Sequence, residues 1–230
     1  MTNPANPIDE LMERASRTLY ETRYFDAAAL CVEGLMQARA SDDFARMARI
    51  CLPLQEARRW IRQTALDTGA VRMIARASDL TDPFEPGCYL VQPPMVGVDA
   101  RQLRWRVWEA GVPVFVLCRE PTTREGLCPI VGVGERVVRV RLDEPEQTDA
   151  SWFAEAGEAL GDRAIVDAEA AGEADDPPAW RVDDLLDRIE AAPDHEKLIQ
   201  ALARACKDAI GTTTPADRRR RRGFDDPRSF

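Results

Sequence analysis

Residues 88–118, with the sequence CYLVQPPMVGVDARQLRWRVWEAGVPVFVLC, decide the fold class. The stretch begins with a short apolar segment, residues 88–92, which two prolines end. Asp99 is a suitable cap for a helix over residues 100–110, and a glycine follows that helix. The unbroken apolar run of residues 112–118 is typical of a strand covered on both faces. A strand, a helix and a strand of these lengths predict a βαβ unit with a right-handed crossover.

Other short segments add strands and a helix to this unit. Residues 71–76 alternate between apolar and polar side chains, as a strand does. Residues 130–133 and 136–142 are separated by a tight turn, and the alternation in the second segment predicts an edge or half-exposed strand. A short helix is expected over residues 150–160, because Gly161 is a suitable residue to end it.

The N-terminal part of the chain is expected to be helical. Residues 8–22 and 25–39 carry apolar side chains at three- and four-residue steps, which is the pattern of helices with one buried face. A longer helix is expected over residues 44–67, with a cap in the aspartates before it. Pro53 lies inside this helix, and we expect it to kink the helix or to split it in two.

The first two of these helices resemble a tetratricopeptide-repeat hairpin. The residues that carry the resemblance are Ala15, Leu19, Phe25, Ala28, Val32 and Leu35. The resemblance covers residues 8–40, with half of a further unit at residues 44–60, and it departs from the family pattern at Ser16, Leu35 and Ala40. Solenoids of this type need about three repeats, so a short solenoid and an ordinary helical hairpin both remain open. A solenoid would imply a concave face that binds a peptide or a partner helix.

The whole chain is therefore predicted to be α+β, in five parts. A helical, tetratricopeptide-like segment at residues 8–67, either a hairpin or a short solenoid, precedes a small βαβββ sheet domain at residues 70–165. An acidic linker at residues 167–178 leads to a C-terminal helical hairpin at residues 179–210. Residues 211–230 form a basic tail whose composition predicts disorder.

Charge is distributed unevenly along the chain, whose net charge is −9. Residues 143–217 hold 6 basic and 20 acidic residues, a net charge of −14, whereas residues 218–230 hold 6 basic and 2 acidic residues. No segment approaches the roughly 20 apolar residues of a membrane-spanning helix. The first residues lack the pattern of a secretory signal. We therefore expect a cytoplasmic protein with no membrane span.

The six cysteines and the single histidine suggest neither a metal site nor a disulfide framework. No two cysteines form a CxxC pair and most lie in apolar runs, which predicts buried free thiols. His195 lies between two acidic residues at the start of a helix, where we expect it to be solvated. A serine or cysteine nucleophile needs a base, most often histidine. We therefore assign no catalytic residue and expect no metal and no cofactor.

A polar loop at residues 118–128 is the candidate ligand-binding site. It follows the carboxyl end of the predicted buried strand, where ligands of open α/β sheets usually bind. Its Arg119, Glu120 and Arg124, together with Asp99, can hold an anionic group or a peptide carboxylate. The same composition also fits a solvated loop, and Asp99 also fits a helix cap.

Two tryptophans and a run of arginines are candidate contacts with other surfaces. Trp105 and Trp108 fall outside the helix face that packs on the sheet, so the N-terminal helices or a partner must cover them. The arginine run can bind nucleic acid or an anionic membrane surface, or screen the acidic segment of the same chain. Its members are Arg218, Arg219, Arg220, Arg221 and Arg222.

Three functions remain open from the sequence. The first is a protein–protein interaction module or adaptor with an unidentified protein partner, which the helical N-terminus and the segregated charge favour. The second is a small-molecule-binding or enzymatic α/β domain that uses the loop at residues 118–128. The third is an RNA- or ribosome-associated factor that uses Arg218–Arg222.

Overall fold

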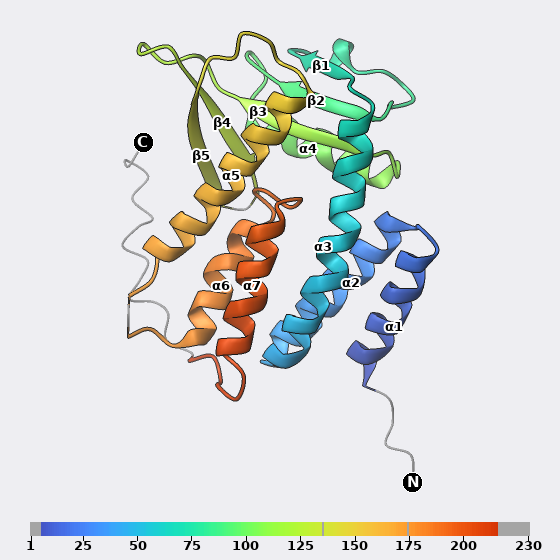
Figure 1. Cartoon of the computed structure of the whole chain (residues 1–230), viewed down its shortest axis with the longest axis vertical. Helices are drawn as coiled ribbons and strands as arrows, with labels where there is room; N and C mark the ends of the chain where they lie inside the picture. Colours follow the sequence, from blue (N-terminus) through green and yellow to red (C-terminus); the bar gives the residue numbers. More distant parts are fainter. Residues whose placement is uncertain (1–5, 135, 174, 216–230) are drawn as a thin grey trace.

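The computed structural model of the chain describes residues 6–134, 136–173 and 175–215. Within these ranges the chain forms seven α-helices and one five-stranded sheet, so the predicted α+β class is confirmed. Figure 1 shows the sheet at one end of the molecule, with α1, α2, α6 and α7 grouped away from it and α3 running between the two regions. None of the described helices combines the length and the hydrophobicity that crossing a bilayer requires.

The elements follow one another in the order α1 (Pro7–Tyr20), α2 (Tyr24–Ala40), α3 (Phe44–Asp67), β1 (Val71–Ile74), a 3-10 turn (Ala77–Asp79), β2 (Gly87–Val91), α4 (Gly97–Glu109), β3 (Val114–Arg119), β4 (Leu127–Val133), β5 (Val137–Asp143), α5 (Ala150–Ala170), α6 (Pro178–Ile189) and α7 (Glu196–Asp208).

The strands lie in the sheet in the order in which they occur in the chain. β1, β2 and β3 are parallel, and β4 and β5 continue the sheet as antiparallel strands. The βαβ unit predicted from residues 88–118 is present as β2, α4 and β3. β5 is an edge strand, as its alternating pattern predicts, and β1 forms the other edge.

Side chains of the central strands alternate between two apolar cores. Tyr89 and Val116 pack with α4 on one face of the sheet. Leu90 and Phe115 belong to the core on the other face, where the remaining helices lie. Helices therefore cover β2 and β3 on both sides, which explains why both sequences are almost entirely apolar.

The larger core extends from the sheet through the N-terminal and the C-terminal helices. α3 packs against α2 and α7 and also contacts β2 and β3. Figure 1 shows α6 and α7 between α3 and α5. All six cysteines are free and buried, as predicted, and Cys31, Cys51 and Cys206 lie in this core. The N-terminal helices are thus stabilised by helices that follow much later in the chain.

The segment that resembles a tetratricopeptide repeat forms three successive packed helices. α1 packs against α2, and α2 packs against α3. On its other side α3 meets α7 and the sheet. The faces of α2 and α3 that a solenoid would offer to a partner are therefore partly covered by the same chain.

Two helices continue through residues at which the sequence predicts an interruption. Pro53 does not split α3, which runs through it as one helix, and the alternative, a kink at Pro53, stays a prediction. The prediction that Gly161 ends a helix is wrong, because α5 continues through it to Ala170. α5 thus extends into the predicted acidic linker, and residues 171–177 connect it to α6.

Gly161 serves close packing rather than helix termination. A Cβ atom at this position would overlap the imidazole ring of His195. Gly157, one turn earlier, faces Phe115, and a Cβ atom there would lie 2.5 Å from Cζ of that ring. The two glycines therefore let the side of α5 approach both the sheet and the connection before α7.

We predict that Gly161→Ala lowers the free energy of unfolding by about 1–3 kcal/mol, because the added methyl group overpacks the site. Gly34→Ala is the matched control, since Gly34 is also buried inside a helix but its nearest neighbour is Ile50 Cδ1, at 3.3 Å. That change should be neutral or stabilising by up to about 1 kcal/mol, the difference in helix propensity. Urea unfolding measures the free energy of unfolding of both variants. Equal losses of stability in Gly161→Ala and Gly34→Ala would contradict the prediction.

Candidate functional site

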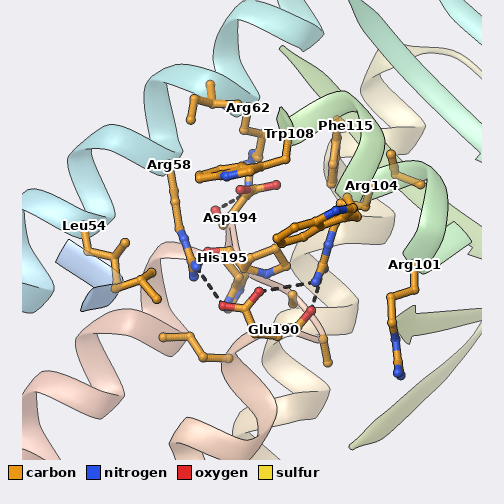
Figure 2. Close-up of a pocket in the computed structure, with 18 of the residues that line it drawn as sticks. Leu54, Arg58, Arg62, Arg101, Arg104, Trp108, Phe115, Glu190, Asp194 and His195 are labelled. Carbon is orange, nitrogen blue, oxygen red and sulfur yellow. Dashed lines mark hydrogen bonds and ion pairs between the residues drawn. The ribbon is translucent and has the colours of Figure 1, made fainter. Parts of the chain in front are cut away.

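A cavity of about 810 Å³ lies where the helices meet the sheet. Its walls come from α2, α3, α4, β3, α5, α6 and the connection of residues 190–195 between α6 and α7. Figure 2 shows charged side chains from α3, α4 and this connection gathered in the cavity, with the rings of Trp108 and Phe115 beside them. The cavity therefore combines apolar side chains with a charged region around Glu190 and Asp194. Other charged residues, among them the ion pair of Arg39 and Asp183, also line it.

The cavity forms beside β3 because β4 pairs with only the end of that strand. The β3–β4 ladder comprises Cys118 and Arg119, whereas residues 114–117 of β3 line the cavity. The connection of residues 190–195 packs against β4 at this point. A Cβ atom at Gly132 would lie 2.7 Å from the Ala191 carbonyl oxygen, so glycine is needed for the close approach.

Glu190 is bound by two arginines that come from different helices. Arg58 of α3 donates from Nη2 to Glu190 Oε1 at 2.8 Å. Arg104 of α4 donates from Nη1 to the Glu190 carbonyl oxygen at 2.6 Å and from Nη2 to Oε2 at 3.3 Å. Figure 2 shows the Glu190 side chain between the two guanidinium groups. The charge of Arg58 lowers the pKa of Glu190, so this carboxyl group is ionised at neutral pH.

Asp194 adds a second carboxyl group to the charged region. Burial raises its pKa, although Arg58, Arg104 and Arg62 oppose the rise. Arg62 donates to the Asp194 carbonyl oxygen at 3.3 Å and to Glu158 Oε1 at 2.8 Å. Arg62 is thus paired with Glu158 of α5. The Asp194 carboxyl group lies among the three arginines, and its burial favours the protonated form.

His195 occupies the N-cap of α7, where its side chain is buried. Its Nδ1 atom accepts a hydrogen bond of 3.1 Å from the Leu198 amide, so the proton of the neutral ring lies on Nε2. Nε2 is 3.3 Å from Glu158 Oε2 and 3.3 Å from Asp162 Oδ1. Burial lowers the pKa of His195. The expected helix-start position is therefore correct, but the expectation that the ring is solvated is wrong, since the residue is only 2% exposed.

The two tryptophans of α4 both line the cavity but differ in exposure. Trp108 packs edge-to-face on Phe25 of α2, with ring centroids 5.1 Å apart, and so contacts the N-terminal helices. Trp105 is 63% exposed. Trp108 thus belongs to a wall of the cavity, whereas Trp105 lies at its rim.

The four residues of the predicted polar site lie outside the cavity. Arg119 donates to Glu144 at 2.9 Å, and Glu120 accepts from Arg139 at 2.7 Å. Asp99 lies in the first turn of α4, which begins three residues earlier than expected, and accepts from the Val96 amide at 2.8 Å. Arg124 is exposed. The structure therefore gives three of the four a local partner and does not place them in the cavity, so their role in binding a ligand stays a prediction.

Two other predictions concern an arginine run and metal ligands. Arg218–Arg222 lie outside the described residues, so the nucleic-acid prediction for them stays a prediction. In the described part of the chain, no three His, Cys, Asp or Glu residues lie together as metal ligands would.

The sequence analysis missed the charged residues of the cavity. For Arg58 a signal was present: Leu54 and Ile61 lie one turn away on either side, so the guanidinium falls on the buried face of α3. An arginine on an apolar helix face needs a buried partner. No sequence pattern near Arg58 identifies that partner as Glu190, because Glu190 lies 132 residues later in the chain.

Comparisons with known proteins give no family for this chain. No family model matches it, and neither a curated protein nor a solved structure does. The resemblance of residues 8–40 to a tetratricopeptide hairpin therefore stays a prediction.

We predict that His195 makes the stability of the protein depend on pH near neutrality. Its pKa in the folded protein lies below the ordinary value of 6.5. As the pH falls through that value, the unfolded chain therefore binds a proton that the folded protein does not yet bind. The free energy of unfolding should then decrease with falling pH, by up to about 1.4 kcal/mol per pH unit.

The test compares wild type with His195→Asn by urea unfolding between about pH 7.5 and 5.5, since asparagine also caps helices but does not titrate. His195 is the only histidine of the chain, so the difference between the two curves isolates this ring. Asp194, whose pKa burial raises, is present in both proteins. Parallel curves would contradict the prediction.

Proposed function

We propose that the protein binds a small organic molecule in the cavity between its helices and its sheet. The observation that carries the proposal is the cavity itself: about 810 Å³, apolar side chains and a charged region around Glu190 and Asp194. Ligand sites in proteins typically measure roughly 300–1,000 Å³ and combine apolar walls with a few convergent polar groups. Carboxyl and imidazole groups with shifted pKa values are also typical of such sites.

The lining indicates the character of the ligand. Val32, Trp108 and Phe115 offer apolar surface from α2, α4 and β3. The charged groups Arg104, Glu190 and Asp194 lie together beside the rings of Trp108 and Phe115. A ligand with an apolar body and one polar end fits this combination. The proposal is for binding, because the described lining residues include no serine, threonine or cysteine that His195 could activate.

We expect the wild type to bind the neutral apolar fluorophore N-phenyl-1-naphthylamine (NPN) at one site, and Val32→Trp to weaken this binding at least about tenfold. The larger side chain at residue 32 would occupy space inside the cavity. Val166→Trp is the matched control, since Val166 is exposed on α5 and does not line the cavity. NPN fluorescence titration measures all three proteins.

Two outcomes would count against this function. The first is the absence of stoichiometric NPN binding to the wild type. The second is equal NPN affinity for Val32→Trp and Val166→Trp, because the fluorophore would then lie elsewhere on the protein.

A protein partner is the second candidate, favoured by the rim of the same cavity. Trp105 and Met36 are both exposed there, and large exposed apolar side chains often lie in protein interfaces. Trp105→Ser should then abolish retention of the partner in affinity purification. Retention of the same protein by wild type and Trp105→Ser would exclude this rim as the interface.

A further inference from the structure

Three arginines of the cavity wall share two carboxylates as direct partners. Arg58 and Arg104 share the single carboxylate of Glu190. Arg62 is paired with Glu158. A third counter-charge for these three guanidinium groups would have to come from Asp194 or from a ligand.

Asp194 is poorly suited to supply that counter-charge. Burial raises the pKa of its carboxyl group, so ionisation there is opposed by the loss of solvent. Its contact with Arg62 is made by the backbone carbonyl oxygen.

Arg104 has donors that an anion in the cavity can reach. Two of its N–H groups donate to Glu190, and a guanidinium group has five such donors. Its side chain is 23% accessible and lines the cavity, whereas Arg58 is almost fully buried. Burial lowers the pKa of Arg104, and Glu190 opposes this effect only in part. The guanidinium group is thus held in a poorly solvated place with unused donors toward the cavity.

We infer that the ligand is an apolar monocarboxylic acid whose carboxylate binds Arg104. The inference rests on the proposed binding function and specifies its ligand class. A planar carboxylate matches the planar donors of arginine, and it would supply a third counter-charge to Arg58, Arg62 and Arg104. The apolar body of the acid then lies against Trp108 and Phe115, the rings beside the charged region in Figure 2.

The test uses matched ten-carbon compounds that differ only in the polar group. Decanoate, decanol, decylammonium and decyl phosphate compete with NPN for the wild-type protein at pH 7.5. Decanoate should displace NPN at a concentration at least about tenfold lower than each of the others, as expected for hydrogen bonds to a charged group.

Two variants of α4 then assign the preference to one residue. Arg104→Gln should reduce the advantage of decanoate over decanol to less than about threefold, because the guanidinium group that binds the carboxylate is removed. Arg106→Gln should leave the advantage unchanged, since Arg106 does not line the cavity and stacks over Phe84. NPN affinity close to that of the wild type shows that each variant retains the cavity.

The outcomes separate this inference from the function on which it rests. If NPN binds but decanol, decylammonium or decyl phosphate competes as well as decanoate, the carboxylate assignment is overturned and the binding function stands. An undiminished preference for decanoate in Arg104→Gln that still binds NPN overturns the role of Arg104. If calorimetry shows that the wild type binds neither NPN nor decanoate, the binding function fails, and the inference fails with it.

Discussion

The side chain of Glu190 joins three parts of the chain that are far apart in sequence. Its carboxylate receives Arg58 from α3 and Arg104 from α4, and its backbone belongs to the connection that leads into α7. Protein atoms surround the group, yet 42% of the side chain is accessible because it faces the cavity. Removing one member of such a group leaves a buried charge unpaired, which costs several kcal/mol. This shared carboxylate therefore fixes where the connection lies, and with it the positions of Asp194 and His195.

The same connection explains why the sheet leaves a space beside β3. Residues 190–195 pack against β4, where Gly132 allows the backbones to come within contact distance. α5 approaches from another side through Gly157 and Gly161, so that Phe115 and His195 lie directly against its backbone. The connection thus packs closely on β4 and α5 at these glycines. It does not fill the gap along β3, and this leaves open space beside residues 114–117.

Local patterns were sufficient for most elements of the fold but not for the site. The βαβ unit and α3 follow from apolar runs and periodicity, and the structure has them at nearly the predicted bounds. Gly161 was misjudged because a glycine in a helical pattern fits either a helix end or a close contact, and the deciding neighbour, His195, is 34 residues away. The charged region could not be predicted for the same reason, because its members are distant in sequence. The predicted polar loop was conspicuous because its charges are adjacent in sequence, whereas Arg58, Arg104 and Glu190 become neighbours only after folding.

The packing of α3 against α7 also depends on the order in which the chain is synthesised. About 130 residues separate the end of α3 from the start of α7. At a synthesis rate of about 5–20 residues per second, the ribosome needs on the order of ten seconds to produce this interval. During that time the face of α3 that packs against α7, which includes Cys51 near Cys206 of α7, has no α7 to cover it. The nascent chain therefore presents to chaperones a surface that the finished protein buries.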